Sequence, residues 1–220
     1  MVYDCLQIRK DVRVALDMND KSKALINLGD MDTLQVDSII DSVVEDAARR
    51  VVEAAPVDML ESGHNFAEDL YWSDDEERKG CGWTILPDDF LRLVLFKMSD
   101  WKRSVSYAIT DTDPSYDLQS SQWKGVRGNV DRPVCAIVRR AEGKVLEYYS
   151  CDSEDAYAEQ AVYQPVPRIS GGGLDLPRLC YRGVVYYAAG LTALSLRDSD
   201  TASAFFSMAM RAINIKTETS

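Results

Sequence analysis

The clearest hydrophobic pattern in the chain predicts one long amphipathic helix over residues 33–55. Apolar side chains recur there at every third or fourth position, which is the period of an α-helix, and charged side chains occupy the other faces. Pro56 ends the pattern, because the residue before a proline is disfavoured in the α conformation. A stripe this wide packs either on the chain's own core or on a neighbouring subunit.

Two more helices are predicted near the end of the chain. The first opens at Asp175 and Pro177 and runs to about Leu196, and the second is capped by Ser199 or Asp200 and runs to about Ile215. Only a few residues separate them, which favours an antiparallel helical hairpin. Residues 3–18 are also compatible with a helix, although their apolar stripe is looser.

The middle of the chain reads mainly as β-structure. Residues 90–98 are apolar on both faces of any strand apart from two basic positions, so they predict a buried strand, with a buried helix as the alternative. Residues 133–151 predict a hairpin that turns at Gly143. Residues 161–166 predict an edge strand, because Pro165 cannot donate a ladder hydrogen bond. Residues 170–173, Ser-Gly-Gly-Gly, predict a flexible connection.

Helices, then strands, then helices again indicate an α+β fold. The predicted architecture is a helical bundle or hairpin core with an inserted antiparallel β segment. Residues 1–60 would supply the N-terminal helices, 61–170 a β-rich insertion with an acidic loop, and 171–216 the C-terminal helical hairpin. The three parts would together form one compact domain.

The net charge of the chain limits the classes of molecule that it is expected to bind. The 220 residues carry a net charge of −11, so phosphate backbones and anionic lipid headgroups repel the chain as a whole. A sequence-reading nucleic-acid binder is therefore disfavoured, whereas an acidic surface would let DNA slide past. No apolar run approaches the roughly 18 residues of a membrane-spanning helix, and no targeting segment is visible at Met1. Five cysteines without a CxxC pair suit a reducing cytoplasm.

The sequence predicts no catalytic residue, no metal site and no cofactor. The single histidine, His64, lies in an acidic segment without a nucleophile elbow and reads as a solvated loop residue. The acids from Asp111 to Asp117 imitate a calcium loop, but its sixth and twelfth positions hold Tyr116 and Gln122 instead of Gly and Glu. The triple glycine lacks the Lys-Ser or Lys-Thr that completes a phosphate loop.

Several segments nevertheless resemble one known family. They are residues 85–98, Ile-Leu-Pro-Asp-Asp-Phe-Leu-Arg-Leu-Val-Leu-Phe-Lys-Met, then 101–105, Trp-Lys-Arg-Ser-Val, then Arg132-Pro133-Val134 with the hairpin after it, and the closing helical hairpin. Together they resemble head–tail adaptor proteins of short-tailed bacteriophages, and most closely the ring or connector proteins of crAss-like phages that infect gut Bacteroidales. The resemblance covers roughly residues 30–215.

The resemblance implies a structural virion protein, made in the host cytoplasm and placed at the head–tail junction. Its subunits would form a ring, typically twelvefold, which stacks on the portal protein, carries further tail proteins and continues the DNA channel. No catalytic residue and no cofactor are implied, and no membrane is involved. Apolar stripes and the acidic loop would supply the candidate interface: Val36, Ile40, Val43, Val44, Val51, Tyr186, Tyr187, Phe205, Phe206, Asp74, Asp75, Glu76 and Glu77.

Two other functions stay open on the sequence alone. One is a cytosolic, non-catalytic protein-interaction module that is monomeric or dimeric. The other is a hydrolase whose site is assembled from acids scattered among the 36 in the chain. A hydrolase would show carboxylates that converge in a buried cleft.

Overall fold

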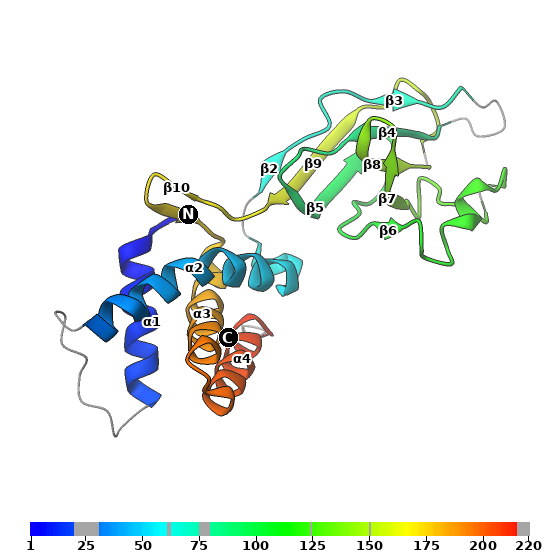
Figure 1. Ribbon diagram of the computed structural model, residues 1–220. Coiled ribbons are helices and arrows are strands. Elements are labelled where there is room, and N and C mark those ends of the chain that lie inside the picture. The colour runs from blue at the N-terminus through cyan, green and yellow to red at the C-terminus, as the bar shows by residue number, and fades with distance from the viewer. Residues whose placement is uncertain (20–30, 61–62, 75–79, 124, 150, 215–220) are drawn as a thin grey trace, which may run out of the picture. The chain divides into compact units, whose positions relative to one another are not determined.

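The computed structural model describes residues 1–19, 31–60, 63–74, 80–123, 125–149 and 151–214 (Figure 1). The chain divides into two compact units. Unit 1 comprises Met1–Ser62 and Val166–Ser220, and unit 2 comprises Gly63–Pro165. The sequence had predicted a single compact domain, with its β-rich part between residues 61 and 170.

Unit 1 is built around one central helix. Its described helices are α1 (Cys5–Asn19), α2 (Met31–Ala54), α3 (Tyr181–Ser195) and α4 (Ser199–Asn214). Helix α3 packs against the other three, with α1 and α4 on different sides of it (Figure 1). It is apolar or small around most of its circumference, as a buried helix must be.

Small residues let the neighbouring helices approach α3 closely. A Cβ atom at Gly183 would lie 2.9 Å from Ile213 Cγ2 of α4 and 3.1 Å from Val51 Cγ1 of α2. Ala188 and Ala189, one to two turns further on, are fully buried. The tight packing of α2, α3 and α4 therefore depends on the short side chains of α3.

The predicted helices at residues 33–55 and from 199 onward are confirmed, but the start of α3 was predicted wrongly. Asp175 belongs to a strand, and a 3₁₀ turn at Arg178–Cys180 leads into the helix at Tyr181. The cap of α4 also lies one residue earlier than predicted. Asp198 Oδ1 accepts a hydrogen bond from the Thr201 N–H at 3.1 Å, as an N-cap side chain does.

A small antiparallel sheet completes unit 1. Its order is β1 (Val2–Asp4), β11 (Gly173–Asp175) and β10 (Ile169–Ser170). Gly171 and Gly172 have φ values of +59° and +80°, and two successive positive φ angles are what a two-residue type I′ hairpin turn requires. The flexible connection predicted for residues 170–173 was therefore wrong, because the glycines form a tight turn between paired strands.

Unit 2 contains two further sheets. A three-stranded sheet has the order β2 (His64–Asn65), β9 (Ala158–Pro165) and β5 (Phe90–Met98). A five-stranded sheet has the order β3 (Tyr71–Trp72), β4 (Gly82–Ile85), β8 (Gly143–Tyr148), β7 (Cys135–Arg140) and β6 (Ile109–Thr110). All neighbours pair antiparallel except β6 and β7, which are parallel.

The strand predicted at residues 90–98 is confirmed, and so is the hairpin that turns at Gly143. The edge position predicted for residues 161–166 is wrong, because β9 lies between β2 and β5. Pro165 is the last residue of β9, so the N–H that it lacks would have fallen at the end of the ladder.

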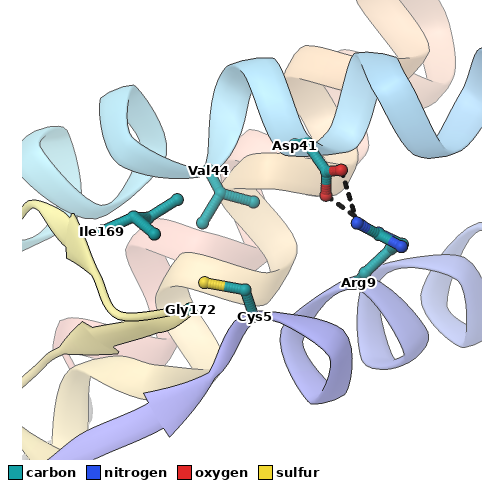
Figure 2. Close-up of a pocket in the computed structure, with 6 residues that line it drawn as sticks. All are labelled: Cys5, Arg9, Asp41, Val44, Ile169 and Gly172. Atoms are coloured by element: carbon teal, nitrogen blue, oxygen red, sulfur yellow. Dashed lines mark hydrogen bonds and ion pairs between the residues drawn. The ribbon is translucent and has the colours of Figure 1, made fainter.

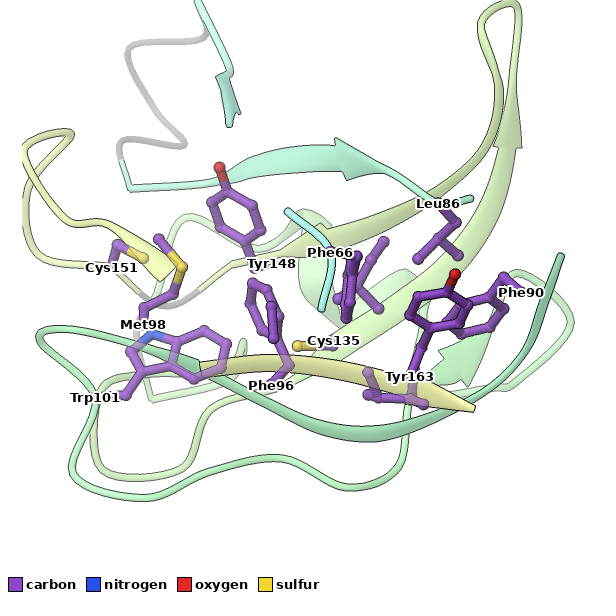
Figure 3. Close-up of a cluster of buried hydrophobic side chains, with 14 of the residues drawn as sticks. Phe66, Leu86, Phe90, Phe96, Met98, Trp101, Cys135, Tyr148, Cys151 and Tyr163 are labelled. Atoms are coloured by element: carbon purple, nitrogen blue, oxygen red, sulfur yellow. The ribbon is translucent and has the colours of Figure 1, made fainter. Parts of the chain in front are cut away.

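Aromatic side chains fill the space between the two sheets of unit 2 (Figure 3). Phe66 contacts Phe96 and Tyr163 with ring centroids 5.9 Å apart in both pairs, and Phe96 stacks on Tyr148 at 6.0 Å. The five-stranded sheet is also covered on its other face, where Val145 and Tyr149 pack with Ile109 and Tyr116. Both faces of this sheet therefore contribute to the core of unit 2.

The predicted helical-bundle core with an inserted antiparallel β segment is therefore wrong. The described residues form four helices and eleven strands in three sheets, a mixed α/β structure whose sheets are extensive and whose β unit has its own core. The broader α+β class remains consistent with this arrangement. Short strands such as β2, β3 and β6 carry no periodicity of their own and become recognisable only through their partners.

Candidate functional site

One carboxylate is buried inside unit 2. Glu147 lies on β8 and is 5% exposed, and it is the single buried acid among the described residues. Side chains alternate along a strand, so Glu147 shares its face with Val145 and Tyr149, away from the space between the two sheets. It therefore requires charged and polar partners on that face.

Those partners are Arg140 at the end of β7, Tyr149 directly after β8, and Tyr116 in the segment after β6. Arg140 Nε donates to Glu147 Oε1 at 2.9 Å, and its Nη2 donates to the same oxygen at 2.5 Å. The hydroxyls of Tyr149 and Tyr116 donate to Oε2 at 2.5 and 3.2 Å. Burial raises the pKa of Tyr116, and the negative charge of Glu147 raises it further. Both carboxylate oxygens are thus already occupied by donors.

The guanidinium of Arg140 also connects this cluster to two aromatic side chains. It lies 4.0 Å above the ring of Trp83, and Trp83 stacks on Tyr71 with ring centroids 5.7 Å apart. A pocket of about 20 Å³ beside Glu147 has room for roughly one water molecule. The cluster therefore anchors a sheet face, and no second buried carboxylate joins it within the described residues, as a glycosidase-type pair would require.

A second pocket, of about 250 Å³, lies in unit 1 between α1, α2 and the β10–β11 hairpin (Figure 2). Cys5 lines it beside Val44 and Ile169, and Arg9 forms an ion pair with Asp41 at its rim. Burial raises the pKa of the Cys5 thiol, and the nearby acids Asp4 and Asp41 raise it further. Because the thiolate is the reactive form, this pocket does not favour nucleophilic chemistry.

The other residues considered for chemistry do not converge. His64 is exposed on the short strand β2, where its ring meets Tyr163 edge-on at 5.9 Å. The Asp113 carboxylate accepts the Ser115 N–H at 2.9 Å and its hydroxyl at 2.6 Å, and these bonds lower the pKa of Asp113. Within the part of the chain that the structure describes, no three His, Cys, Asp or Glu side chains are grouped to hold a metal ion.

The predicted interface residues fall into three groups: buried residues, half-buried residues and residues of the acidic loop. Ile40, Val44, Val51 and Phe205 are at most 3% exposed and belong to the core of unit 1. These four side chains are therefore not accessible to a partner. Five others are half-buried: Val36, Val43, Tyr186, Tyr187 and Phe206.

The half-buried aromatic residues connect the last two helices. Tyr187 contacts Phe206 with ring centroids 4.8 Å apart, and Tyr186 stacks on Phe205 at 6.4 Å. Of the acidic loop, Asp74 is exposed, while Asp75, Glu76 and Glu77 lie outside the described residues.

The apolar side chains that are exposed are different ones. In unit 1 they include Met1, Ile169, Leu179 and Met208, and two groups that are named here as surfaces. The first, called the α1 surface, consists of Val2, Leu6 and Val14, which are 69%, 63% and 48% exposed. The second, called the corner surface, consists of Leu194 and Leu196 at the turn from α3 to α4, each 51% exposed. Helical spacing alone did not distinguish these residues from core positions.

None of the helices in the described ranges is long and apolar enough to cross a lipid bilayer. No protein-family model matches the chain, and no curated protein sequence matches it.

Proposed function

We propose that the chain is a structural subunit of the head–tail junction of a short-tailed bacteriophage. Its copies would assemble into a ring that stacks on the portal protein and continues the DNA channel. The observation that carries the proposal is that unit 1 exposes two different apolar surfaces, the α1 surface and the corner surface. The first lies on β1 and α1, and the second lies at the C-terminal end of α3.

Two unlike surfaces on one subunit suit head-to-tail association. In a heterologous interface, one patch of a subunit meets a different patch of the next, and the series closes into a ring when the rotation allows it. A twofold dimer would instead need one self-complementary patch. Apolar side chains that are half exposed or more lose contact with water when such an interface forms, which stabilises the assembly.

Two further features support the same proposal. Residues 85–98 and the hairpin after Arg132-Pro133-Val134, which carry part of the resemblance to phage adaptor proteins, contain β5, β7 and β8 of unit 2. The net charge of −11 would let DNA slide along a channel wall instead of binding tightly to it. The proposed site of action is accordingly the virion, at the head–tail junction.

The test of the proposal is the mass of the assembly. The purified chain, alone and mixed with the portal protein of the same phage, is measured by mass photometry and native mass spectrometry. A closed ring, or a ring that forms only on the portal, is the expected result, with twelve copies as the family resemblance implies. A chain that remains monomeric in both samples would contradict the proposal.

Two charge substitutions test the head-to-tail geometry. Leu6→Asp places a charge on the α1 surface and Leu196→Asp places one on the corner surface, so each variant alone should fail to assemble. A mixture of the two should form heterodimers, because the intact α1 surface of one variant meets the intact corner surface of the other. Ser203→Asp adds the same charge to an exposed position of α4 and should assemble normally.

A further inference from the structure

A polar pocket of about 560 Å³ lies in unit 2, in the segment between β6 and β7. Two arginines line it, Arg127 and Arg132, and they differ in exposure. Arg127 is only 5% exposed, whereas Arg132 is exposed at the surface. The Nε and Nη1 atoms of Arg127 are buried away from solvent, so this arginine contributes its positive charge from within the pocket wall, where that charge is screened less than at a free surface.

The backbone around Arg127 is held in place by hydrogen bonds. The N–H of Arg127 donates to the carbonyl of Trp123 at 3.1 Å. On its other side, the N–H of Gly128 donates to the side-chain oxygen of Gln119 at 2.9 Å, and Gln119 is itself buried and bonded to the Ser115 carbonyl at 3.0 Å. The pocket wall is therefore formed before any ligand arrives, which lowers the entropic cost of binding.

Arg132 is positioned by a separate tight turn. The N–H of Asn129 donates to the Arg132 carbonyl at 3.1 Å, and the N–H of Arg132 donates back to the Asn129 carbonyl at 2.9 Å. The Asn129 side chain accepts a further bond from the Arg132 N–H at 3.0 Å. Both arginines thus project from constrained backbone instead of a loose loop.

The one acid on the pocket lining is neutralised by neighbouring bases. Lys102 Nζ lies 2.6 Å from the Asp131 carboxylate. The hydrogen bond from Lys102 lowers the pKa of Asp131, and the positive charges of Lys102, Arg103 and Arg132 lower it further. Four basic residues therefore surround this acid and the pocket, in a chain that is strongly acidic overall.

We propose that this pocket binds a phosphate group, with the exposed guanidinium of Arg132 as its donor and the buried positive charge of Arg127 behind it. The planar guanidinium presents paired N–H groups at the spacing of two phosphate oxygens. The shared chemistry is the phosphate group, and its source is either free inorganic phosphate or the backbone of a nucleic acid.

The experiment measures both sources with the full-length chain. Fluorescence anisotropy follows a labelled twelve-residue oligo-dT at several salt concentrations, and inorganic phosphate is added as a competitor. The expected result is salt-dependent binding that Arg132→Ala weakens about fivefold to tenfold at low salt. The slope of log affinity against log salt should decrease by about 1, as for one lost phosphate contact.

Competition by phosphate at millimolar concentration would show that the group alone is recognised. Sensitivity to Arg132→Ala without competition would assign the site to the polymer backbone, which also supports the proposal. Arg127→Lys keeps the positive charge in the pocket wall, so it should weaken binding less than Arg132→Ala does. If the Arg127 variant fails to fold, as circular dichroism would reveal, the exposed Arg132 still decides the outcome.

Lys144→Ala is the matched control. Lys144 is an exposed base of the same unit, at the far end of β7 and β8 from Val134, about 20 Å away along the strand. Equal losses in the Arg132 and Lys144 variants would mean diffuse charge attraction and would overturn the proposal, as would the absence of binding to either probe. The measurement does not depend on ring formation, so its failure and the failure of the connector proposal are distinguishable.

Discussion

Glu147 brings a negative charge into a face of the β-sheet that is otherwise apolar. The carboxylate is held by Arg140, Tyr149 and Tyr116, and Arg140 in turn covers Trp83. A buried ion pair contributes little relative to a well-packed apolar substitute, but removing one partner leaves the others with unsatisfied groups. The residue therefore acts as the link between β8, the end of β7 and the segment that carries Tyr116.

Glu147→Ala should lower the free energy of unfolding of unit 2 by about 2–3 kcal/mol. The effect is smaller than for a fully buried pair, because the Arg140 side chain is 35% exposed and can regain water. Urea unfolding measures the loss, with Glu142→Ala at the exposed hairpin turn as the control, which should change the stability by less than about 0.5 kcal/mol. Equal losses in both variants would show that the cluster stabilises nothing.

Strand β4 is in close contact with its neighbours at one glycine, and the local sequence does not predict this contact. A Cβ atom at Gly82 would lie 2.2 Å from the Tyr71 carbonyl oxygen and 2.7 Å from the Tyr148 hydroxyl. These two groups are themselves hydrogen-bonded at 3.0 Å, directly over the glycine. The pairing of β3 with β4 and the seating of Tyr148 in the core therefore both require the absence of a side chain at this position.

Gly82→Ala is expected to destabilise unit 2 by about 2–3 kcal/mol, because the added methyl group meets backbone and a buried ring that cannot both move away. Thermal unfolding monitored by near-ultraviolet circular dichroism reports on the aromatic core. Gly125→Ala is the control, since a Cβ atom there would contact nothing within 4 Å. A stability of Gly82→Ala within the range of that control would disprove the close-contact argument.

The whole molecule is organised as one unit inserted into another. Unit 2 begins and ends on paired strands, since His64 of β2 lies opposite Tyr163 of β9. Its two apolar clusters are made entirely of its own residues, which fall between Phe66 and Tyr163. A unit with adjacent ends and its own core fulfils the requirements for independent folding.

Residues 63–165 expressed alone should therefore fold. The expected observation is a cooperative thermal transition with a heteronuclear NMR spectrum whose dispersed resonances overlay those of the same residues in the full chain. A second version that carries Phe96→Ala, which empties the centre of the aromatic core, should lose several kcal/mol and serves as the unfolded reference. A spectrum collapsed to random-coil shifts for the unsubstituted fragment would contradict the division into units.

The sequence by itself determined the elements whose signal is local. Helix α2 and the β7–β8 hairpin follow from side-chain period and from one glycine, because each depends on residues within a single segment, whereas the apolar run of β5 also allowed a buried helix. For the same reason the four predicted interface residues that the fold buries were identifiable as apolar, but not as core. The period of a helix shows that a face is buried, and it does not show whether the chain itself covers that face.

Only the tertiary structure decided which distant segments meet. It placed β9 at the centre of its sheet, turned the triple glycine into a hairpin, and gave the β unit a core of its own. It also joined Glu147 to Tyr116, and Lys102 to Asp131, across stretches of chain that share no pattern. Contacts of this kind depend on the free energy of packing the entire unit, to which every segment contributes, so no single stretch of sequence contains them.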